Sequence, residues 1–494
     1  MSKREWAKDQ KKIFYEVVST NNDIAIPATA GGGKTTVLEE ISRLLPVKSS
    51  SIFLAFNKTI VNELEERLPN GFDVSTLHSM GLRILKKNYG KNIKINNGKI
   101  YKASQKLILS KKEISNTRER NSRIFFMQKG YDYLRSTLCD INNREEIEEM
   151  LDRFSIVSDY GYEDLKELSD YLNKYNNSIK RGRDFEIDFG DMIHLPSTLK
   201  GLKYDKYDNI LVDEVQDLNK CQAKLLKKIR AKGSRLITVG DKFQSIYLFS
   251  GADSESFESF SSAEGTSVLP LGVTYRCPIN VVEEARKYSP NISPAPNAEH
   301  GFVGEGFLDN VDEGDAVLCR NNSPLFEAYI KFLEEGKKAY IVGKDIAERF
   351  HSLIKPYKSS HLQALIDGLN TQLTLISDAL SSKGVRNPEQ HPKYQAFLDI
   401  SMSISVLANS CSSVSELISR IDDIFHPKKD AIILSSIHKS KGLEYDRVFL
   451  LRPDLLPSKF AKSEEEMMQE NNLMFVAITR ARKQFFYVYK EDEE

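Results

Sequence analysis

Short apolar runs alternate with segments of helical spacing in the first part of the chain. Residues 23–26, 51–56 and 72–75 are apolar runs of strand length, while residues 37–45 and 60–68 place apolar side chains at helical spacing. Strands that alternate with helices predict an α/β fold with a parallel sheet. In such a sheet, ligands gather at the carboxyl ends of the strands.

Helical patterns then replace this alternation over residues 84–183. The charged residues of 101–135 are mainly basic, and those of 140–170 are mainly acidic. Charge runs of this kind usually belong to solvated helix faces, and a basic face that follows DNA is the alternative. The strand pattern resumes at residues 207–212 and 235–239.

Helical spacing returns between residues 347 and 429. Apolar residues mark one amphipathic helix over residues 362–380 and suggest a second over residues 397–407. We interpret this segment as a small helical cap with its own core. The strands that flank it are expected at residues 316–320, 338–343, 431–434 and 447–451.

The composition limits the class of protein. The chain has 494 residues, enough for several cores, and Lys+Arg and Asp+Glu are both 70, so any basic surface must be local. Five well-separated cysteines without a C-x-x-C pair indicate a reducing compartment and argue against zinc or iron–sulfur ligation. No apolar run approaches membrane-spanning length, and the first residues lack the apolar core of a signal peptide. We therefore expect a soluble cytoplasmic protein.

The glycine-rich sequence A-T-A-G-G-G-K-T-T, residues 28–36, lies between the first strand and the first helix. Its glycines let backbone N–H groups surround an anion, and the next helix presents its positive dipole end. The lysine can reach the β- and γ-phosphates of ATP, and the first threonine hydroxyl can bind Mg²⁺. The alternative is a glycine-rich turn with a chance Lys-Thr pair, but the strand-to-helix context favours a nucleotide site. The predicted ATP contacts are Ala30, Gly31, Gly32, Gly33, Lys34, Thr35 and Thr36.

A pair of carboxylates, Asp213 and Glu214, follows the strand at residues 207–212. In a chain with a phosphate loop, Asp213 is expected to hold Mg²⁺ with Thr35, and Glu214 to orient or deprotonate the attacking water. Acidic pairs at strand ends also occur as plain helix caps. Gln244, which follows the next strand, is expected beside the phosphates if these two strands are neighbours.

Polar residues also follow the second and third strands. Asn57 and Lys58 come after one, and Thr76 and His78 after the other. Amide, hydroxyl and lysine groups at strand ends suit contacts to a nucleic-acid backbone. Upstream of the first strand, the Gln10 amide could pair with the donor and acceptor edges of adenine.

The order of these motifs resembles the UvrD/Rep-like DNA helicases of superfamily 1. The loop A-T-A-G-G-G-K-T is followed by V-D-E-V-Q-D and V-G-D-K-F-Q-S-I-Y, then by T-Y-R-C-P, S-I-H-K-S-K-G-L-E-Y and L-M-F-V-A-I-T-R-A-R. The segments L-A-F-N-K and S-T-L-H-S are similar to the short DNA-contacting motifs of the F-box helicase branch. These signatures run from Gln10 to Arg482, in the order found in the family.

The resemblance implies two RecA-like parallel-sheet domains with helical insertions and with ATP between the domains. The expected boundaries are 1–83 and 184–272 for the first domain, 84–183 for its insertion, 273–346 and 430–494 for the second domain, and 347–429 for a second insertion that is shorter than usual in the family. The chain ends soon after the sixth motif, so we expect no nuclease domain.

The resemblance also assigns roles to individual residues. The expected catalytic residues are Lys34, Glu214, Gln244, Arg276 and Arg480, the two arginines stabilising charge on the phosphates. Gln10 and Tyr275 are expected near the adenine, and Glu444 is expected among the ATP contacts. The expected DNA contacts are Phe56, Asn57, Thr76, His78, Tyr247, Phe249 and His438.

Phe249 departs from the family pattern, because this position usually carries a tryptophan on which a base stacks. A phenylalanine face can also stack on a base. The alternative is that Phe249 fills a core, as most phenylalanines do.

We expect an enzyme that hydrolyses ATP with Mg²⁺, translocates on single-stranded DNA and unwinds tailed duplexes. The resemblance implies 3′-to-5′ movement in DNA repair, replication or recombination. One alternative is a DNA-stimulated ATPase that translocates or remodels protein–DNA complexes without unwinding. A small-molecule phosphotransferase is disfavoured because two expected catalytic arginines lie far along the chain. Backbone contacts and base stacking do not distinguish DNA from RNA, so RNA stays an alternative. The sequence does not indicate a protein partner.

Overall fold

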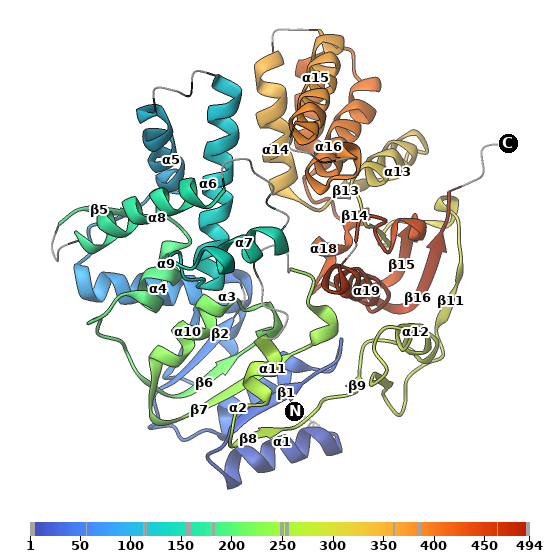
Figure 1. Cartoon of the computed structure of the whole chain (residues 1–494). Helices are drawn as coiled ribbons and strands as arrows, with labels where there is room; N and C mark the ends of the chain where they lie inside the picture. Colours follow the sequence, from blue (N-terminus) through green and yellow to red (C-terminus); the bar gives the residue numbers. More distant parts are fainter. Residues whose placement is uncertain are drawn as a thin grey trace. The chain divides into compact units, whose positions relative to one another are not determined.

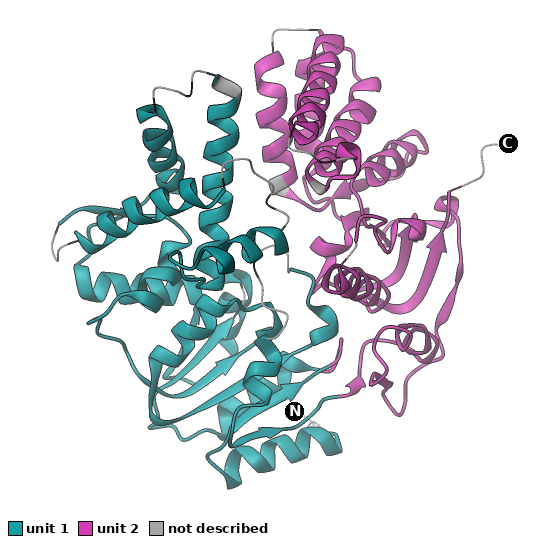
Figure 2. Ribbon diagram, viewed as in Figure 1, with its two compact units in different colours: residues 1–28, 33–271 teal, residues 29–32, 272–494 magenta. Residues whose placement is uncertain are grey.

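The computed structural model describes residues 5–55, 57–111, 114, 116–154, 156, 161–179, 183–247, 251, 256–358, 361–382, 385, 387–461 and 463–490. The chain forms two compact units (Figure 2). Residues 1–28 and 33–271 belong to unit 1, and residues 29–32 and 272–494 belong to unit 2. The predicted fold class, α/β with two parallel-sheet domains, is confirmed.

Unit 1 is built on a six-stranded sheet whose described strand pairs are all parallel (Figure 1). The strand order is β3-β2-β6-β7-β1-β8. The strands are β1 Asp23–Pro27, β2 Ser51–Ala55, β3 Phe72–Thr76, β6 Tyr207–Val212, β7 Arg230–Gly240 and β8 Thr266–Val268. The sequence analysis expects Gln244 beside the phosphates if the strand before it neighbours the strand before Asp213. These two strands, β7 and β6, are neighbours.

Alternating side chains of these strands enter two cores, one on each face of the sheet. Ile52 and Leu54 pack with residues of α4 Leu77–Tyr89, α9 Asp191–Thr198, α10 Lys220–Ile229 and α11 Ser256–Ser261. Phe53 and Ala55, from the same strand, pack with residues of α1 Lys8–Ser19, α2 Lys34–Leu44 and α3 Lys58–Arg67. The period-2 alternation of side chains in a strand produces this three-layer arrangement.

The segment between β3 and β6 is mainly helical, as the sequence predicts. It contains α5 Lys99–Ser110, α6 Thr117–Thr137, α7 Arg144–Arg153 and α8 Gly161–Asn177, which enclose a separate apolar cluster. A short parallel strand pair, β4 Ile93–Ile95 with β5 Phe185–Ile187, was not predicted, because three-residue strands leave almost no periodic signal.

Unit 2 contains a second six-stranded sheet, in the order β11-β16-β15-β12-β14-β13, with parallel described pairs. Its strands are β11 Phe302–Glu305, β12 Ala316–Cys319, β13 Ala339–Ile341, β14 Ile432–Ser436, β15 Tyr445–Leu451 and β16 Ala481–Val488. A short parallel pair, β9 Val273–Thr274 with β10 Ser293–Pro294, precedes this sheet in the chain. The helices are α12 Ile279–Ala285, α13 Ser323–Glu334, α14 Lys344–Ile354, α15 Leu362–Ser381, α16 Pro392–Asn409, α17 Val414–Ile424, α18 Ile437–Ser440 and α19 Glu464–Ile478.

Two predicted helices of residues 347–429 are confirmed as α15 and α16, but the expectation of a separate core is wrong. Leu369 and Ile404 belong to the same cluster as Val317 and Phe449 of the sheet. Phe326 of α13 lies 5.4 Å, centroid to centroid, from the ring of Phe350 and so joins the two parts. The four-part domain division stays a prediction.

Among the described residues, no single helix is long and apolar enough to cross a membrane. One bent pair of helices, Lys393–Asn409 with Val414–Ile424, meets the same criteria of length and composition when taken together.

Candidate functional site

The glycine-rich loop begins directly after β1 and ends at the first residue of α2. Gly31 and Gly33 have positive φ angles of 70° and 76°, a conformation that glycine adopts without strain. A Cβ at Gly31 would lie 2.6 Å from Thr274 Oγ1, so the loop also has no room for a side chain there. Because Gly33 is the N-cap of α2, the first free N–H groups of the helix lie at Lys34 and the residues after it.

Lys34 forms an ion pair with the carboxylate that follows β6. Its Nζ lies 2.7 Å from Glu214 Oε1, and the side chains of the two residues are 12% and 21% exposed. Burial disfavours the ammonium, but Glu214, Asp213 and Asp241 together raise the pKa of Lys34 above its ordinary value. The three carboxylates therefore favour the charged form of Lys34.

Thr35 and Asp213 meet on the same side of the loop. The Thr35 hydroxyl donates to Asp213 Oδ2 at 3.2 Å. Burial, followed by the negative charge of Glu214, raises the pKa of Asp213 to about 6. A hydroxyl and a buried carboxylate side by side are oxygen ligands of the type that Mg²⁺ prefers, and a cation there would offset the charge repulsion. These residues therefore fit a divalent metal.

Gln244 lies in the short helical turn Lys242–Gln244 that follows β7. It is 4% exposed, and its Nε2 donates to Asp241 Oδ2 at 2.6 Å. Burial raises the pKa of Asp241. The place of Gln244 beside the phosphates stays a prediction.

Gln10 of α1 also lies near the loop. Its side chain is 6% exposed, and its Oε1 accepts a hydrogen bond from the backbone of Ala7 at 3.0 Å. Gln10 Nε2 is 3.8 Å from the position that a Cβ of Gly33 would occupy. This amide of α1, the helix before β1, therefore lies beside the phosphate loop.

Three more expected ATP contacts, Tyr275, Arg276 and Glu444, belong to unit 2. The Tyr275 backbone N–H donates to the Gly31 carbonyl at 2.9 Å, and the Tyr275 side chain is 51% exposed. Arg276 Nε donates to Glu444 Oε2 at 2.7 Å, and its Nη1 donates to the Thr479 carbonyl at 3.3 Å. Arg276 and Glu444 are therefore paired with each other.

Arg480 has a different environment from Arg276. Arg480 is 1% exposed. Its guanidinium donates to the carbonyls of Val476 and Leu443, each at 3.0 Å. It also donates to Thr479 Oγ1 at 3.1 Å. The predicted catalytic role of Arg480 stays a prediction, and the structure gives this side chain contacts that hold α19 to the segment before β15.

Two expected DNA contacts, Asn57 and Thr76, are N-caps of helices. Asn57 Oδ1 accepts from the Ile60 N–H at 2.9 Å, and Thr76 Oγ1 accepts from the Ser79 N–H at 3.2 Å. Since β2 pairs with β3, these caps lie at the same edge of the sheet. Capping explains both residue types without DNA, and their DNA contacts stay predictions.

The remaining expected DNA contacts differ in their surroundings. The His78 ring stacks on Phe189 with centroids 4.0 Å apart, and burial lowers the pKa of His78 to about 4. Burial raises the pKa of Tyr247 to about 12 and lowers that of His438 to about 3. Phe56 and Phe249 lie outside the described residues, so both stay predictions.

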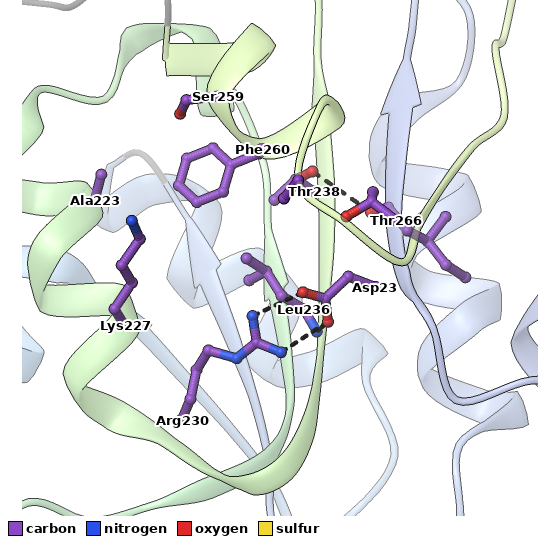
Figure 3. A pocket seen from close by; sticks show the side chains of 11 residues that line it. Asp23, Ala223, Lys227, Arg230, Leu236, Thr238, Ser259, Phe260 and Thr266 are labelled. Carbon is purple, nitrogen blue, oxygen red and sulfur yellow. Dashed lines mark hydrogen bonds and ion pairs between the residues drawn. The ribbon is translucent and has the colours of Figure 1, made fainter.

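A cavity of about 120 Å³ lies elsewhere in unit 1 (Figure 3). It is lined by Asp23 and Arg230, which pair at 2.7 Å, and by Phe260. Asp23 and Arg230 are the first residues of β1 and β7, whereas the phosphate loop follows the last residue of β1. The cavity is thus at the opposite end of the sheet from the ATP-site residues and takes no part in that site.

Comparison with known families supports this arrangement of motifs. The UvrD/REP helicase N-terminal domain matches residues 6–264, and the UvrD-like helicase C-terminal domain matches residues 431–488. This chain belongs to the UvrD/REP helicase family. The resemblance inferred from the motifs is confirmed.

Individual relatives in the UvrD/REP family include bacterial and eukaryotic proteins. The chain is 30% identical to the ATP-dependent DNA helicase PcrA of Bacillus subtilis, over 95% of this chain and 81% of the relative. It is 25% identical to the F-box DNA helicase protein 1 of Schizosaccharomyces pombe and 22% identical to the F-box DNA helicase 1 of Gallus gallus. Each of these two alignments covers 96% of this chain, which spans 56% and 48% of the respective relatives.

Two residues of this UvrD/REP site have no role in the sequence analysis. Asp241 accepts from Gln244, and Gln216 lies between Glu214 and Asp241. Both occur inside quoted motifs, V-G-D-K-F-Q and V-D-E-V-Q-D, so their position in the sequence was the available signal. Their contacts depend on the pairing of β6 with β7, which the motifs alone do not specify.

Proposed function

We propose that this protein is an ATP-driven translocase on single-stranded DNA that unwinds tailed duplexes. The observation that carries the proposal is the cluster of Lys34, Thr35, Asp213 and Glu214 around one glycine-rich loop. Membership of the UvrD/REP helicase family supports the choice of DNA as the partner.

In this proposal the loop and α2 bind the phosphates of ATP through backbone N–H groups, while Lys34 leaves Glu214 to contact the β- and γ-phosphates. Mg²⁺, held by Thr35 and Asp213, would neutralise charge on those phosphates. Release from Lys34 leaves the Glu214 carboxylate able to accept a proton from the attacking water. Gln244 would contact the γ-phosphate.

Arg276 and Arg480 of unit 2 are proposed to stabilise the charge that spreads over the transferring phosphoryl group. Gln10 and Tyr275 would hold the adenine, and Arg276 would exchange Glu444 for phosphate oxygens. A nucleotide that contacts residues of both units favours one arrangement of them, so hydrolysis can drive a step along DNA.

Movement from 3′ to 5′ and a role in repair, replication or recombination are part of the same proposal. A DNA-stimulated ATPase that does not unwind is the second candidate. It is favoured by the small size of the helical segment 347–429, which in this chain contains most of α14 and all of α15, α16 and α17.

The deciding experiment measures ATP hydrolysis with and without a single-stranded oligonucleotide, followed by unwinding of duplexes with 3′ or 5′ tails. Stimulation and unwinding of the 3′-tailed duplex are expected. Stimulation without strand separation would select the second candidate, and lack of stimulation would refute both.

The Glu214→Gln variant tests the role of the carboxylate. We expect it to bind ATP normally and to lose turnover by about 10²- to 10⁴-fold, because the amide keeps the shape but cannot accept the proton. Glu63→Gln is the control, since Glu63 is a 57% exposed carboxylate on α3. Normal turnover in Glu214→Gln would contradict the assignment.

A further inference from the structure

Gln216 is buried between the two strand ends that carry Glu214 and Gln244. It belongs to the short helical turn Val215–Asp217 after β6 and is 2% exposed. Its Nε2 donates a hydrogen bond to Glu214 Oε2, and its Oε1 accepts one from the Asp241 backbone N–H at 3.0 Å. One side chain therefore contacts both the predicted base and the end of β7.

The neutral amide satisfies both neighbours. The Asp241 N–H requires an acceptor, and the Glu214 carboxylate requires a donor, and a glutamine provides one of each on opposite sides of its terminal group. A glutamate in this place would set two carboxylates against each other, and an apolar side chain would leave both partners unsatisfied.

The hydrogen bonds continue from Asp241 to the other catalytic candidate. Asp241 Oδ2 accepts from Gln244 Nε2 at 2.6 Å, while Oδ1 accepts from the Phe243 N–H at 3.1 Å. Glu214 and Gln244 are thus connected through Gln216 and Asp241. Movement of either end would break one of these hydrogen bonds.

The backbone of β7 leaves space for this contact. A Cβ at Gly240 would lie 2.6 Å from Gln216 Oε1 and 2.8 Å from Val215 Cγ1. Gly240 therefore allows the two strand ends to approach closely enough for the amide to bridge them.

One contact of Glu214 is expected to change during the reaction. Its Oε1 pairs with Lys34, which the proposed function directs to the phosphates of ATP. Its backbone has a positive φ of 52°, so the residue begins from a strained turn. The hydrogen bond from Gln216 reaches the other oxygen, Oε2, and so does not depend on the pair with Lys34.

We propose that Gln216 is a positioning residue that orients the Glu214 carboxylate toward the attacking water and keeps it in register with Gln244. The proposal rests on the proposed ATP hydrolysis at this site. It does not depend on DNA unwinding.

The first test compares Gln216→Glu and Gln216→Met with the wild-type chain in steady-state ATP hydrolysis. Gln216→Glu keeps the side-chain shape and the acceptor for the Asp241 N–H but loses the donor to Glu214. Gln216→Met keeps only the approximate side-chain volume and loses both hydrogen bonds. We expect kcat to fall about 10- to 100-fold in both variants, as is typical when a residue that orients a functional group is lost. KM for ATP and oligonucleotide affinity should stay within about 2-fold. Gln222→Met is the matched control, because Gln222 accepts from the Asn219 N–H in the same region without contacting Glu214.

Two results would overturn this proposal. One is unchanged kcat in Gln216→Glu. The other is a parallel loss of kcat, ATP affinity and melting temperature in both variants, which would indicate a purely structural role.

The second test is a double-mutant cycle with Glu214→Gln under single-turnover conditions. If Gln216 acts through Glu214, Gln216→Met in the Glu214→Gln background should cause no further loss of rate. A loss as large as that in the wild-type background would refute the proposal. Lack of oligonucleotide stimulation in the wild-type chain would instead refute the proposed function, and the cycle would still report on Gln216 through basal hydrolysis.

Discussion

Arg276 and Arg480, the two arginines expected to act on ATP, differ in what they contact. The Arg276 side chain is 15% exposed and pairs with one carboxylate, that of Glu444. Arg480 is buried and donates to backbone carbonyls of two separate segments. Removing either guanidinium should cost catalysis. Loss of the Arg480 guanidinium should also lower stability, because it is the more deeply buried of the two and joins two separate segments.

We predict that Arg276→Ala lowers turnover on the order of 10³-fold with little change in melting temperature. Arg480→Ala should lower turnover and also destabilise unit 2 by about 1–3 kcal/mol, because the hydrogen bonds of a buried guanidinium to two segments are lost. Turnover and denaturant unfolding measured on the same samples check both, with Arg420→Ala on the surface of α17 as control. Equal stability of the Arg276 and Arg480 variants would contradict the structural role of Arg480.

His194 gives a pH dependence to the stability of unit 1. Burial, followed by the positive charge of Arg135, lowers the pKa of His194 from 6.5 to about 4. The unfolded chain therefore binds a proton more readily than the folded chain between these pH values. Stability contributed by neutral His194 is present above about pH 6.5 and is lost as the pH falls toward 4.

We predict that His194→Gln loses less stability than the wild-type chain between pH 7 and pH 4. The difference in slope should approach, at most, about 1.4 kcal/mol per pH unit, because one proton is involved. Urea unfolding at a series of pH values measures it. Comparison with the wild-type chain cancels the contributions of His78 and His438. Parallel curves for the two chains would show that His194 does not carry this dependence.

At the scale of elements, α4 and α9 pack at the distance allowed by a glycine. A Cβ at Gly81 would lie 1.8 Å from the Met192 carbonyl oxygen, which is far inside van der Waals contact. Backbone cannot move aside as a flexible side chain can. The contact of these two helices, which cover one face of the unit 1 sheet, therefore depends on this residue.

We predict that Gly81→Ala destabilises unit 1 by about 3 kcal/mol, since α4 and α9 must separate. Gly130→Ala is the matched control. Gly130 also lies within a helix, but its added Cβ would meet the Leu165 methyl carbons at 3.3 Å, and its cost should stay below about 1 kcal/mol because of the gain in helix propensity. Denaturant midpoints of the two variants decide it, and equal effects would contradict the packing argument.

At the scale of the whole molecule, each unit has its own sheet and its own apolar cores. Lys34, Thr35, Asp213 and Glu214 all belong to unit 1, whereas Arg276, Glu444 and Arg480 belong to unit 2. Separate cores favour unfolding in more than one step. A ligand held mainly by one unit should then stabilise that unit more than the other.

We predict more than one calorimetric transition, of which ATP with Mg²⁺ raises the one that belongs to unit 1. The stabilisation should be about 2.7 kcal/mol at an ATP concentration of 100 times Kd. Lys34→Ala should abolish both this shift and hydrolysis, because the ammonium at the β- and γ-phosphates is lost. A shift of the same size in Lys34→Ala would contradict the placement of ATP at the loop.

The sequence by itself determined the parts of this protein that are encoded by neighbouring residues. The glycine-rich loop, the pair Asp213–Glu214 and the strands β1, β2, β3 and β6 are contiguous patterns, and their order identified the family. Such features can be predicted because side-chain periodicity and local backbone chemistry act within a few residues.

The tertiary structure decided what depends on residues far apart in the chain. The strand order β3-β2-β6-β7-β1-β8 is not sequential, and it alone brings Gln216 against Asp241 and Thr35 against Asp213. It also buries Arg480, which the motif alone presents as a catalytic group. The physical reason is that burial and hydrogen-bond partners are set by which strands and helices become neighbours, and a local pattern contains no record of that choice.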